Sequence, residues 1–262
     1  LRMTGAEMVV KTLEKNGVKV VFGYPGAANC PIIDKLSFSS IKHILTRNEQ
    51  GAAHMASGYA RVTKQAGVCT ATSGPGATNL ITGIATAYMD SIPMVALTGQ
   101  VATKLIGKDA FQEVDITGAT LPFTKHSYLI KDGLDIPRVV NEAFHIANTG
   151  RPGPVLIDFP MDLLKKEFDY PDEDEDVNIR GYKLMGKANE SQVKKVAEAI
   201  KGAKKPVILA GGGVVISDAT NEFRKFVKET DIPVVSTMMG IGILPSDNPR
   251  YYGMIGSHGV KR

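Results

Sequence analysis

Glu49 is the residue in this sequence whose type and position most suggest chemistry. The apolar run Ile41–Leu45 precedes it and is typical of a buried strand, and Gln50–Thr63 follows with a helical pattern rich in small residues. In an open parallel sheet, ligands bind at the carboxyl ends of the strands. An acid there could hold a proton for a bound ligand. Alternatively, Glu49 complements the helix dipole, worth about 0.3–1 kcal/mol at a surface, and this stretch alone favours that alternative.

Gly74–Asn79 follows an expected strand and could present backbone N–H groups to an anion. Gly211–Gly213 also follows an expected strand, where a simple turn into a helix accounts for it. Neither is a dinucleotide-binding fingerprint, because Asn79 and Ile216 stand where that pattern requires glycine or alanine. The sequence contains no P-loop lysine motif, no G-x-S-x-G and no H-E-x-x-H. The five histidines show no metal-ligand spacing. The sequence therefore predicts neither a hydrolase of these types nor a metal site.

Alternating strands and helices should position these residues in an α/β domain with a parallel sheet, over residues 1–168. The expected strands are Val18–Phe22, Ile41–Leu45, Gly67–Ala71, Met94–Thr98 and Val155–Phe159. The expected helices are one after a capping box at Thr4–Glu7, Pro31–Leu36, Gln50–Thr63, one from the Gly74 loop to about Asp90, and Ile136–Asn148.

An acidic segment follows at residues 169–188, and we expect it to be a solvated interdomain linker. A second, Rossmann-like α/β pattern begins after it and covers residues 189–262 without a visible end. Its expected elements are a helix at Ser191–Lys201, a strand at Val207–Ala210, a helix at Ala219–Thr230 and a strand at Val234–Thr237. We interpret this region as part of a second domain.

Composition excludes several classes of partner. The chain has 262 residues, 43% of them hydrophobic, and a net charge of +4 from scattered basic residues, which argues against nucleic-acid binding. No apolar run reaches the roughly 18 residues that a membrane span needs. Cys30 and Cys69 lie far apart without a C-x-x-C motif, so we expect reduced thiols in a cytoplasmic protein.

Five motifs occur together in one order, and their combination resembles a known family. They are Gly23–Gly26, Arg47–His54, Thr72–Asn79, Asp109–Glu113 and Gly150–Val155. The sequence resembles the thiamine-diphosphate-dependent enzymes and, within them, the large catalytic subunits of acetolactate synthase. The resemblance implies that the first domain binds the aminopyrimidine of thiamine diphosphate and that the second is part of a central, FAD-associated domain. It places the Mg²⁺ and diphosphate site on a third domain that this chain does not contain.

The resemblance also implies roles for particular residues. Glu49 matches the acid that hydrogen-bonds the aminopyrimidine, and Phe111 and Gln112 match residues that line the substrate and cofactor cleft. Residues that match the thiamine-diphosphate site are Tyr24, Pro25, Gly26, Gly74, Pro75, Gly76 and Asn79. Residues that match flavin contacts are Arg151, Gly211, Gly212, Gly213, Thr237, Met238, Met239, His258 and Gly259.

The implied activity is the decarboxylating condensation of pyruvate with pyruvate or 2-ketobutyrate, in branched-chain amino-acid biosynthesis. The implied assembly is a homodimer with the active site at the subunit interface, with a regulatory small subunit as a further partner. This chain alone is then expected to be inactive. The alternatives are another thiamine-diphosphate-dependent 2-keto acid carboligase or decarboxylase, and a non-catalytic nucleotide-binding module.

Three positions depart from the family pattern. Asn48 stands where the family usually has His, Ala27 replaces the second glycine of a Gly-Gly pair, and Met161 stands where many members have Lys near the substrate entrance. The last departure bears on substrate handling and leaves the class of enzyme unchanged.

Overall fold

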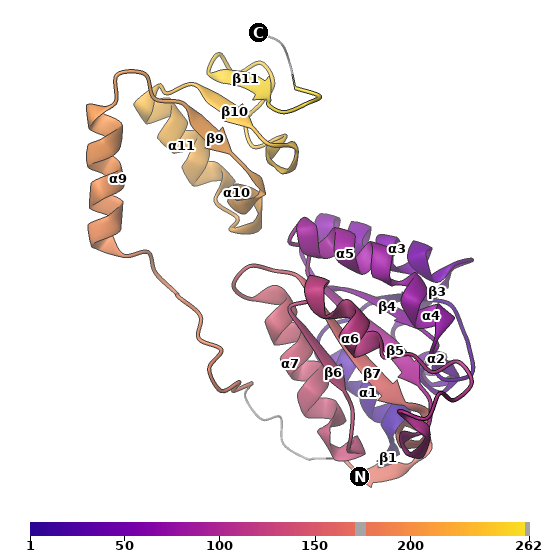
Figure 1. Cartoon of the computed structure of the whole chain (residues 1–262). Helices are drawn as coiled ribbons and strands as arrows, with labels where there is room; N and C mark the ends of the chain where they lie inside the picture. The colour runs from indigo at the N-terminus through magenta and orange to yellow at the C-terminus, as the bar shows by residue number, and fades with distance from the viewer. Residues whose placement is uncertain (171–176, 260–262) are drawn as a thin grey trace. The chain divides into compact units, whose positions relative to one another are not determined.

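The computed structural model describes residues 1–170 and 177–259. The chain divides into two compact units, and the boundary between them in the sequence lies between Leu184 and Met185 (Figure 1). In the first unit a six-stranded parallel sheet has the strand order β3-β2-β4-β5-β7-β6. Its strands are β2 (Val20–Gly23), β3 (Lys42–Leu45), β4 (Gly67–Ala71), β5 (Met94–Gln100), β6 (His126–Leu129) and β7 (Pro154–Pro160). A separate antiparallel pair joins β1 (Arg2–Thr4) to β8 (Glu167–Asp169). The predicted α/β class and parallel sheet are confirmed.

Helices cover both faces of this sheet, with α1 and α7 on one face and α3 and α5 on the other (Figure 1). The α-helices are α1 (Gly5–Lys15), α2 (Cys30–Leu36), α3 (Glu49–Thr63), α4 (Pro75–Asn79), α5 (Ile81–Met89), α6 (Ile116–Thr120), α7 (Ile136–Asn148) and α8 (Met161–Lys165). Three short 3-10 helices are η1 (Thr103–Leu105), η2 (Leu121–Phe123) and η3 (Gly133–Asp135). The expected helix after the Gly74 loop is divided at Leu80 into α4 and α5.

Local sequence signals account for the helix that supports the main core. The predicted capping box is present, because Glu7 N donates to Thr4 Oγ1 at 3.2 Å and Thr4 N donates to Glu7 Oε2 at 2.8 Å. The apolar face of α1 then buries Met8 and Leu13 completely. On the opposite face of the sheet α3 approaches β4 so closely that a Cβ atom at Gly67 would lie 2.0 Å from the Ala56 carbonyl oxygen. Small residues are therefore required where α3 packs.

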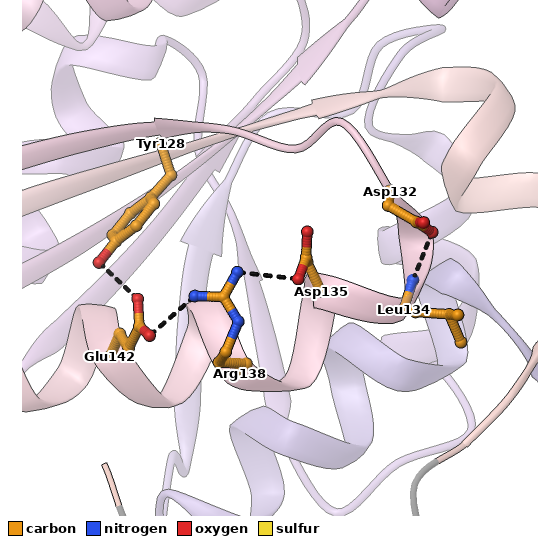
Figure 2. Close-up of polar contacts among 6 residues, drawn as sticks. All are labelled: Tyr128, Asp132, Leu134, Asp135, Arg138 and Glu142. Atoms are coloured by element: carbon orange, nitrogen blue, oxygen red, sulfur yellow. Dashed lines mark hydrogen bonds and ion pairs between the residues drawn. The ribbon is translucent and has the colours of Figure 1, made fainter. Parts of the chain in front are cut away.

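A chain of polar contacts ties the edge strand β6 to α7 (Figure 2). Tyr128 Oη donates to Glu142 Oε2 at 2.8 Å, and Arg138 donates to Glu142 Oε1 and Asp135 Oδ1, also at 2.8 Å. Burial and the hydrogen bond to Glu142 raise the pKa of Tyr128. Asp132 caps the turn before α7 by accepting a hydrogen bond from Leu134 N at 3.0 Å. These contacts stabilise a strand that sequence periodicity did not predict.

The first unit extends past residue 168, where the sequence analysis ends the first domain. Tyr170 is buried in the core, and Ile179 packs against the same core. Tyr182 accepts a hydrogen bond from Lys125 Nζ at 3.2 Å, which places a second part of the expected linker against this unit. The acidic run at 171–176 lies outside the described residues.

The second unit is a smaller α/β layer with three parallel strands in the order β11-β10-β9. Its strands are β9 (Ile208–Ala210), β10 (Val234–Ser236) and β11 (Tyr251–Met254), and its helices are α9 (Glu190–Gly202), α10 (Gly212–Ile216), α11 (Thr220–Thr230) and the 3-10 helix η4 (Met238–Gly240). A small core forms from Ala210, Val227, Val234, Ile243 and Leu244. Helix α9 buries none of its residues.

Candidate functional site

Glu49 occupies the first position of α3, immediately after the carboxyl end of β3. The helix is capped by its neighbour, because Asn48 Oδ1 accepts a hydrogen bond from Gln50 N at 2.8 Å. The departure at Asn48 thus has a local structural role. Glu49 itself is only 9% exposed. Its carboxylate is hydrogen-bonded to a residue that follows a second loop.

That second loop is Gly74–Gly76, which follows β4. Asn79, at the end of α4, donates from Nδ2 to Glu49 Oε2 at 3.0 Å. A Cβ atom at Gly76 would lie 2.7 Å from Thr72 Cγ2 and 3.3 Å from Glu49 Oε1, so the close packing beside this oxygen requires glycine. Among the residues described here, Oε1 accepts no hydrogen bond. The site therefore offers one carboxylate oxygen of a largely buried residue to a donor from a ligand.

The turn Tyr24–Gly26 lies beside the same loop. Gly26 packs against Thr72, where a Cβ atom would lie 2.5 Å from the Thr72 side chain. Asn29, which is fully buried, fixes the turn: its Oδ1 accepts from Gly26 N at 2.8 Å and its Nδ2 donates to Tyr24 O at 3.1 Å. Thr72 Oγ1 also accepts from Ala28 N at 3.1 Å. Sequence reasoning missed Asn29, because its partner Thr70 is distant in the chain.

The segment 101–115, which follows β5, brings Gln112 to this edge of the sheet. Gln112 has a φ of 58°, unusual for a residue with a side chain. Its backbone packs on Gly74, where a Cβ atom would lie 2.6 Å from the Gln112 carbonyl oxygen. Phe111, the preceding residue, is 88% exposed. One cluster therefore forms at the carboxyl ends of β2, β3, β4 and β5. It contains Glu49, Asn79, Gln112, the turn Tyr24–Gly26 and the loop Gly74–Gly76.

A buried carboxyl group that the sequence analysis did not single out lies under this segment. Asp158, on β7, is 1% exposed and accepts hydrogen bonds from Thr98 Oγ1 at 2.6 Å and Gln100 Nε2 at 2.8 Å. Burial raises its pKa from the ordinary value of 3.8 to about 7, against the opposing effect of these hydrogen bonds. The signal in the sequence was one acid within an otherwise apolar strand.

The second unit brings together most of the residues predicted to contact flavin. Gly211–Gly213 follow β9 and Thr237–Met239 follow β10, and the two loops are neighbours because Thr237 N donates to Ala210 O at 2.9 Å. A Cβ atom at Gly212 would lie 2.9 Å from Met239 Cβ. His258 and Gly259 follow β11, which is parallel to β10. All three segments therefore leave the same edge of the small sheet.

Arg151 belongs to the first unit and not to the flavin-matching loops of the second. Its Nε donates to Ser91 Oγ at 2.7 Å, and the residue is exposed. Ser91 has a φ of 59°, in the turn before β5. This contact holds the base of the Arg151 guanidinium group against the surface of its own unit.

Three further observations concern metals, thiols and membranes. Within residues 1–170 and 177–259, no group of three or more His, Cys, Asp or Glu side chains is arranged to hold a metal ion. Cys30 is exposed and Cys69 is buried, and both are free thiols; burial raises the pKa of Cys69 to about 12. None of the helices in the described part of the chain is long and apolar enough to cross a membrane.

Comparison with known families identifies two matching domain models. Residues 3–119 match the N-terminal thiamine pyrophosphate binding domain of thiamine pyrophosphate enzymes. Residues 193–262 match the central domain of the same enzymes. The first match contains the cluster around Glu49, and the second contains the glycine-rich loops of the small sheet.

Curated relatives are similar along nearly the whole chain. A protein of Methanocaldococcus jannaschii described as a probable acetolactate synthase large subunit is 53% identical over 262 residues, covering 99% of this chain and 44% of its own length. An acetolactate synthase of Mycobacterium bovis is 52% identical, with 99% and 42% covered. An acetolactate synthase large subunit of Haemophilus influenzae is 47% identical over 261 residues, with 99% and 46% covered. The chain thus spans less than half the length of these relatives.

Proposed function

Because this chain belongs to the thiamine pyrophosphate enzymes, we propose that it is part of the large catalytic subunit of an acetolactate synthase. The proposed reaction joins two 2-keto acids, pyruvate with pyruvate or 2-ketobutyrate, with loss of CO₂, in branched-chain amino-acid biosynthesis. Sequence identities of about half to relatives of that name support this reaction over a simple decarboxylation. The observation that carries the proposal is the buried Glu49 carboxylate with one oxygen open to a ligand.

The residues around Glu49 fit the aminopyrimidine of thiamine pyrophosphate. Oε1 can accept a hydrogen bond from a protonated ring nitrogen, and Gly76 places no side chain next to this oxygen. Asn79 holds the other carboxylate oxygen, which orients the group. When bound, the cofactor supplies the electron sink for decarboxylation. Glu49 contributes by holding a proton at a fixed atom in a site largely screened from water.

Phe111 and Gln112 are proposed to contact the substrate. Gln112 reaches the cluster through its backbone contact with Gly74, and its exposed side chain is available to a ligand. Phe111 is an exposed aromatic ring beside the cluster, as expected of a surface that a second subunit covers. This supports a homodimer in which both subunits build the site. A regulatory small subunit is a further proposed partner, consistent with the "large subunit" in the relatives' names.

FAD is proposed as a second cofactor, bound through the loops after β9, β10 and β11. Glycines at the carboxyl ends of parallel strands allow a nucleotide to approach the backbone, which is the arrangement of Gly211–Gly213 beside Thr237. Arg151, which matches a flavin contact of the family, is a further proposed contact. Mg²⁺ is proposed to bind with the diphosphate, through residues in the part of the relatives that this chain does not span. The two free thiols support a cytoplasmic location.

The test is to incubate the complete gene product with pyruvate, thiamine pyrophosphate, Mg²⁺ and FAD. We expect acetolactate, measured as acetoin after acid treatment, and we expect no product from residues 1–262 alone. Acetaldehyde as the only product would instead identify a decarboxylase. Failure to consume pyruvate, in a preparation shown by calorimetry to bind thiamine pyrophosphate, would refute the proposal.

A further inference from the structure

Asp158 and Gln100 form a buried polar connection beneath the segment that carries Phe111 and Gln112. Gln100, the last residue of β5, is 4% exposed and pairs in register with the end of β7. Its amide donates from Nε2 to Asp158 Oδ2 and to Val114 O, both at 2.8 Å. Its Oε1 accepts from Val101 N at 2.9 Å. A flipped amide would face donors with donors and acceptors with acceptors, so the orientation of Gln100 is fixed.

These contacts join the two ends of one segment. Val101 begins the segment and Val114 lies near its end, and both are bonded to the single Gln100 side chain. Asp158 in turn holds Gln100 from the buried side, and its other oxygen is bonded to Thr98. The base of the 101–115 segment is therefore anchored to the centre of the sheet by one carboxyl group.

Other acids hold only exposed parts of the same segment. Asp162 accepts hydrogen bonds from Thr103 N at 2.9 Å and Thr103 Oγ1 at 2.6 Å. Glu113 accepts from the backbone N–H groups of Gly107 and Ala110. These contacts shape the outer part of the segment. Asp158 is the acid whose contacts reach the ends of the segment through a buried side chain.

The position of Gln112 depends on this base. Its backbone lies against Gly74, in the loop whose Gly76 lies beside Glu49, so a shift of the segment would move Gln112 relative to the acid. Resting on the proposed function, we propose that Asp158 is a positioning residue for the reaction. By holding Gln100, it keeps Gln112 in place beside the Glu49 cluster. In the described part of the chain the Asp158 carboxylate is hydrogen-bonded to Thr98 and Gln100, so it acts on Gln112 through the segment between them.

Two substitutions at Asp158 test whether its hydrogen bonds hold the 101–115 segment in place. Asp158→Leu keeps the number and branching of the side-chain heavy atoms but removes both acceptors, leaving Thr98 and Gln100 each without one partner. Asp158→Asn can keep its Oδ1 towards Gln100 and turn its amide group towards Thr98, whose hydroxyl can accept. The Asn variant should therefore preserve the position of the segment, and the Leu variant should not.

The experiment measures hydrogen–deuterium exchange of peptides covering 101–115, and pyruvate kinetics, in the complete gene product. We expect faster exchange in this segment for Asp158→Leu, with kcat reduced by about 10- to 100-fold and KM changed much less, because a displacement of about 1 Å can cost that much in rate. Asp158→Asn should restore both. Thr12→Val is the matched control, because it removes a buried hydroxyl whose 2.8 Å bond to Met8 O lies within α1, and it should change neither.

Gln100→Met provides an independent variant if Asp158→Leu fails to fold. It removes the ties to Val101 and Val114 while leaving Thr98 bonded to Asp158, and it should reproduce the faster exchange and lower kcat. Unchanged exchange at 101–115 in a folded Leu or Met variant would overturn the inference, as would loss of activity in Asp158→Asn equal to that in Asp158→Leu. A wild-type protein without activity on pyruvate would refute the proposed function, while the exchange measurement would still decide whether Asp158 holds the segment.

Discussion

Asp158→Asn should make the stability of the first unit less sensitive to pH. Burial raises the pKa of Asp158 from 3.8 to about 7 in the folded state, whereas the unfolded chain keeps the ordinary value. The folded state therefore binds this proton more tightly. Its contribution to stability is complete below about pH 4 and is lost progressively as the pH rises to about 7. The asparagine side chain does not titrate in this pH range, so the variant does not lose stability in this way.

The size of the effect follows from the separation of the two pKa values. About three units at 1.36 kcal/mol per unit give a loss of roughly 4 kcal/mol between pH 4 and pH 8. Between pH 5 and pH 8 the same relation leaves about 2–3 kcal/mol, since part of the loss has already occurred at pH 5. This is a large fraction of the stability of an ordinary domain, which is about 5–15 kcal/mol.

The assay is urea unfolding of wild type and Asp158→Asn, followed by far-ultraviolet circular dichroism at pH 5 and pH 8. The free energy of unfolding of the variant, relative to wild type, should rise by about 2–3 kcal/mol between these pH values. Asp162→Asn is the matched control. Although burial raises the pKa of Asp162, the hydrogen bonds from Thr103 outweigh this and lower it, so its effect should be constant above pH 5. If the free energies of unfolding of wild type and Asp158→Asn differ by the same amount at pH 5 and pH 8, the pKa of Asp158 is not raised in the folded protein.

Three other substitutions test other parts of the structure. Glu49→Gln keeps an acceptor for Asn79 but cannot carry the proton. Acetolactate formation in the complete protein should therefore fall at least about 100-fold, while the circular dichroism spectrum stays unchanged. Near-normal turnover would refute the role of Glu49. Burial lowers the pKa of His43, so the folded state disfavours its protonation and loses stability as pH falls below about 6.5. His43→Asn should reduce the shift in urea midpoint between pH 7.5 and pH 5.5, and an unchanged shift would contradict this. Lys125 Nζ donates to Ile146 O and Thr149 O at the end of α7. Lys125→Met should therefore lower the free energy of unfolding, measured in urea, by about 1–3 kcal/mol. An unchanged free energy of unfolding would show that water replaces these bonds.

The elements that position the site were predictable because their sequences carry strong periodic signals. The strand predicted at Gly67–Ala71 is confirmed with the same bounds, and the helix predicted from Gln50 begins one residue earlier, at Glu49. Strand β4 lies in the middle of the sheet and α3 packs against it, where apolar runs and small-residue faces give clear signals. The junction that places Glu49 at the carboxyl-terminal edge of the sheet follows directly from them.

The elements that were not predicted are held by side-chain contacts that leave no periodic trace. Strand β6 lies at the edge of the sheet, and its residues His126 and Ser127 break any apolar alternation. The segment 101–115 is ordered by acids that accept from its own backbone, such as Glu113, and by Gln100 from β5. Such contacts depend on which residues the fold brings together, and their partners can lie far apart in the sequence.

Asp158 and Asn29 show two degrees of this difficulty. Asp158 was visible in principle, because a single acid within a strand that is buried on both faces must find partners or a shifted pKa. Its partners Thr98 and Gln100 lie about 60 residues earlier, so only the pairing of β5 with β7 identifies them. Asn29 resembles an ordinary helix-capping residue, and its role in fixing the turn at Gly26 appears only in three dimensions.

The structure adds contacts that bear on the two interpretations of Glu49 that the sequence left open. A residue that merely complements the helix dipole would be exposed and would gain about 0.3–1 kcal/mol. Glu49 is instead 9% exposed, and the free N–H of Gln50 at the start of the helix is satisfied by Asn48. Its carboxylate reaches across to Asn79 on another loop. Glu49 thus makes a long-range contact that a residue complementing the helix dipole would not need, which supports the proposed ligand contact at Oε1.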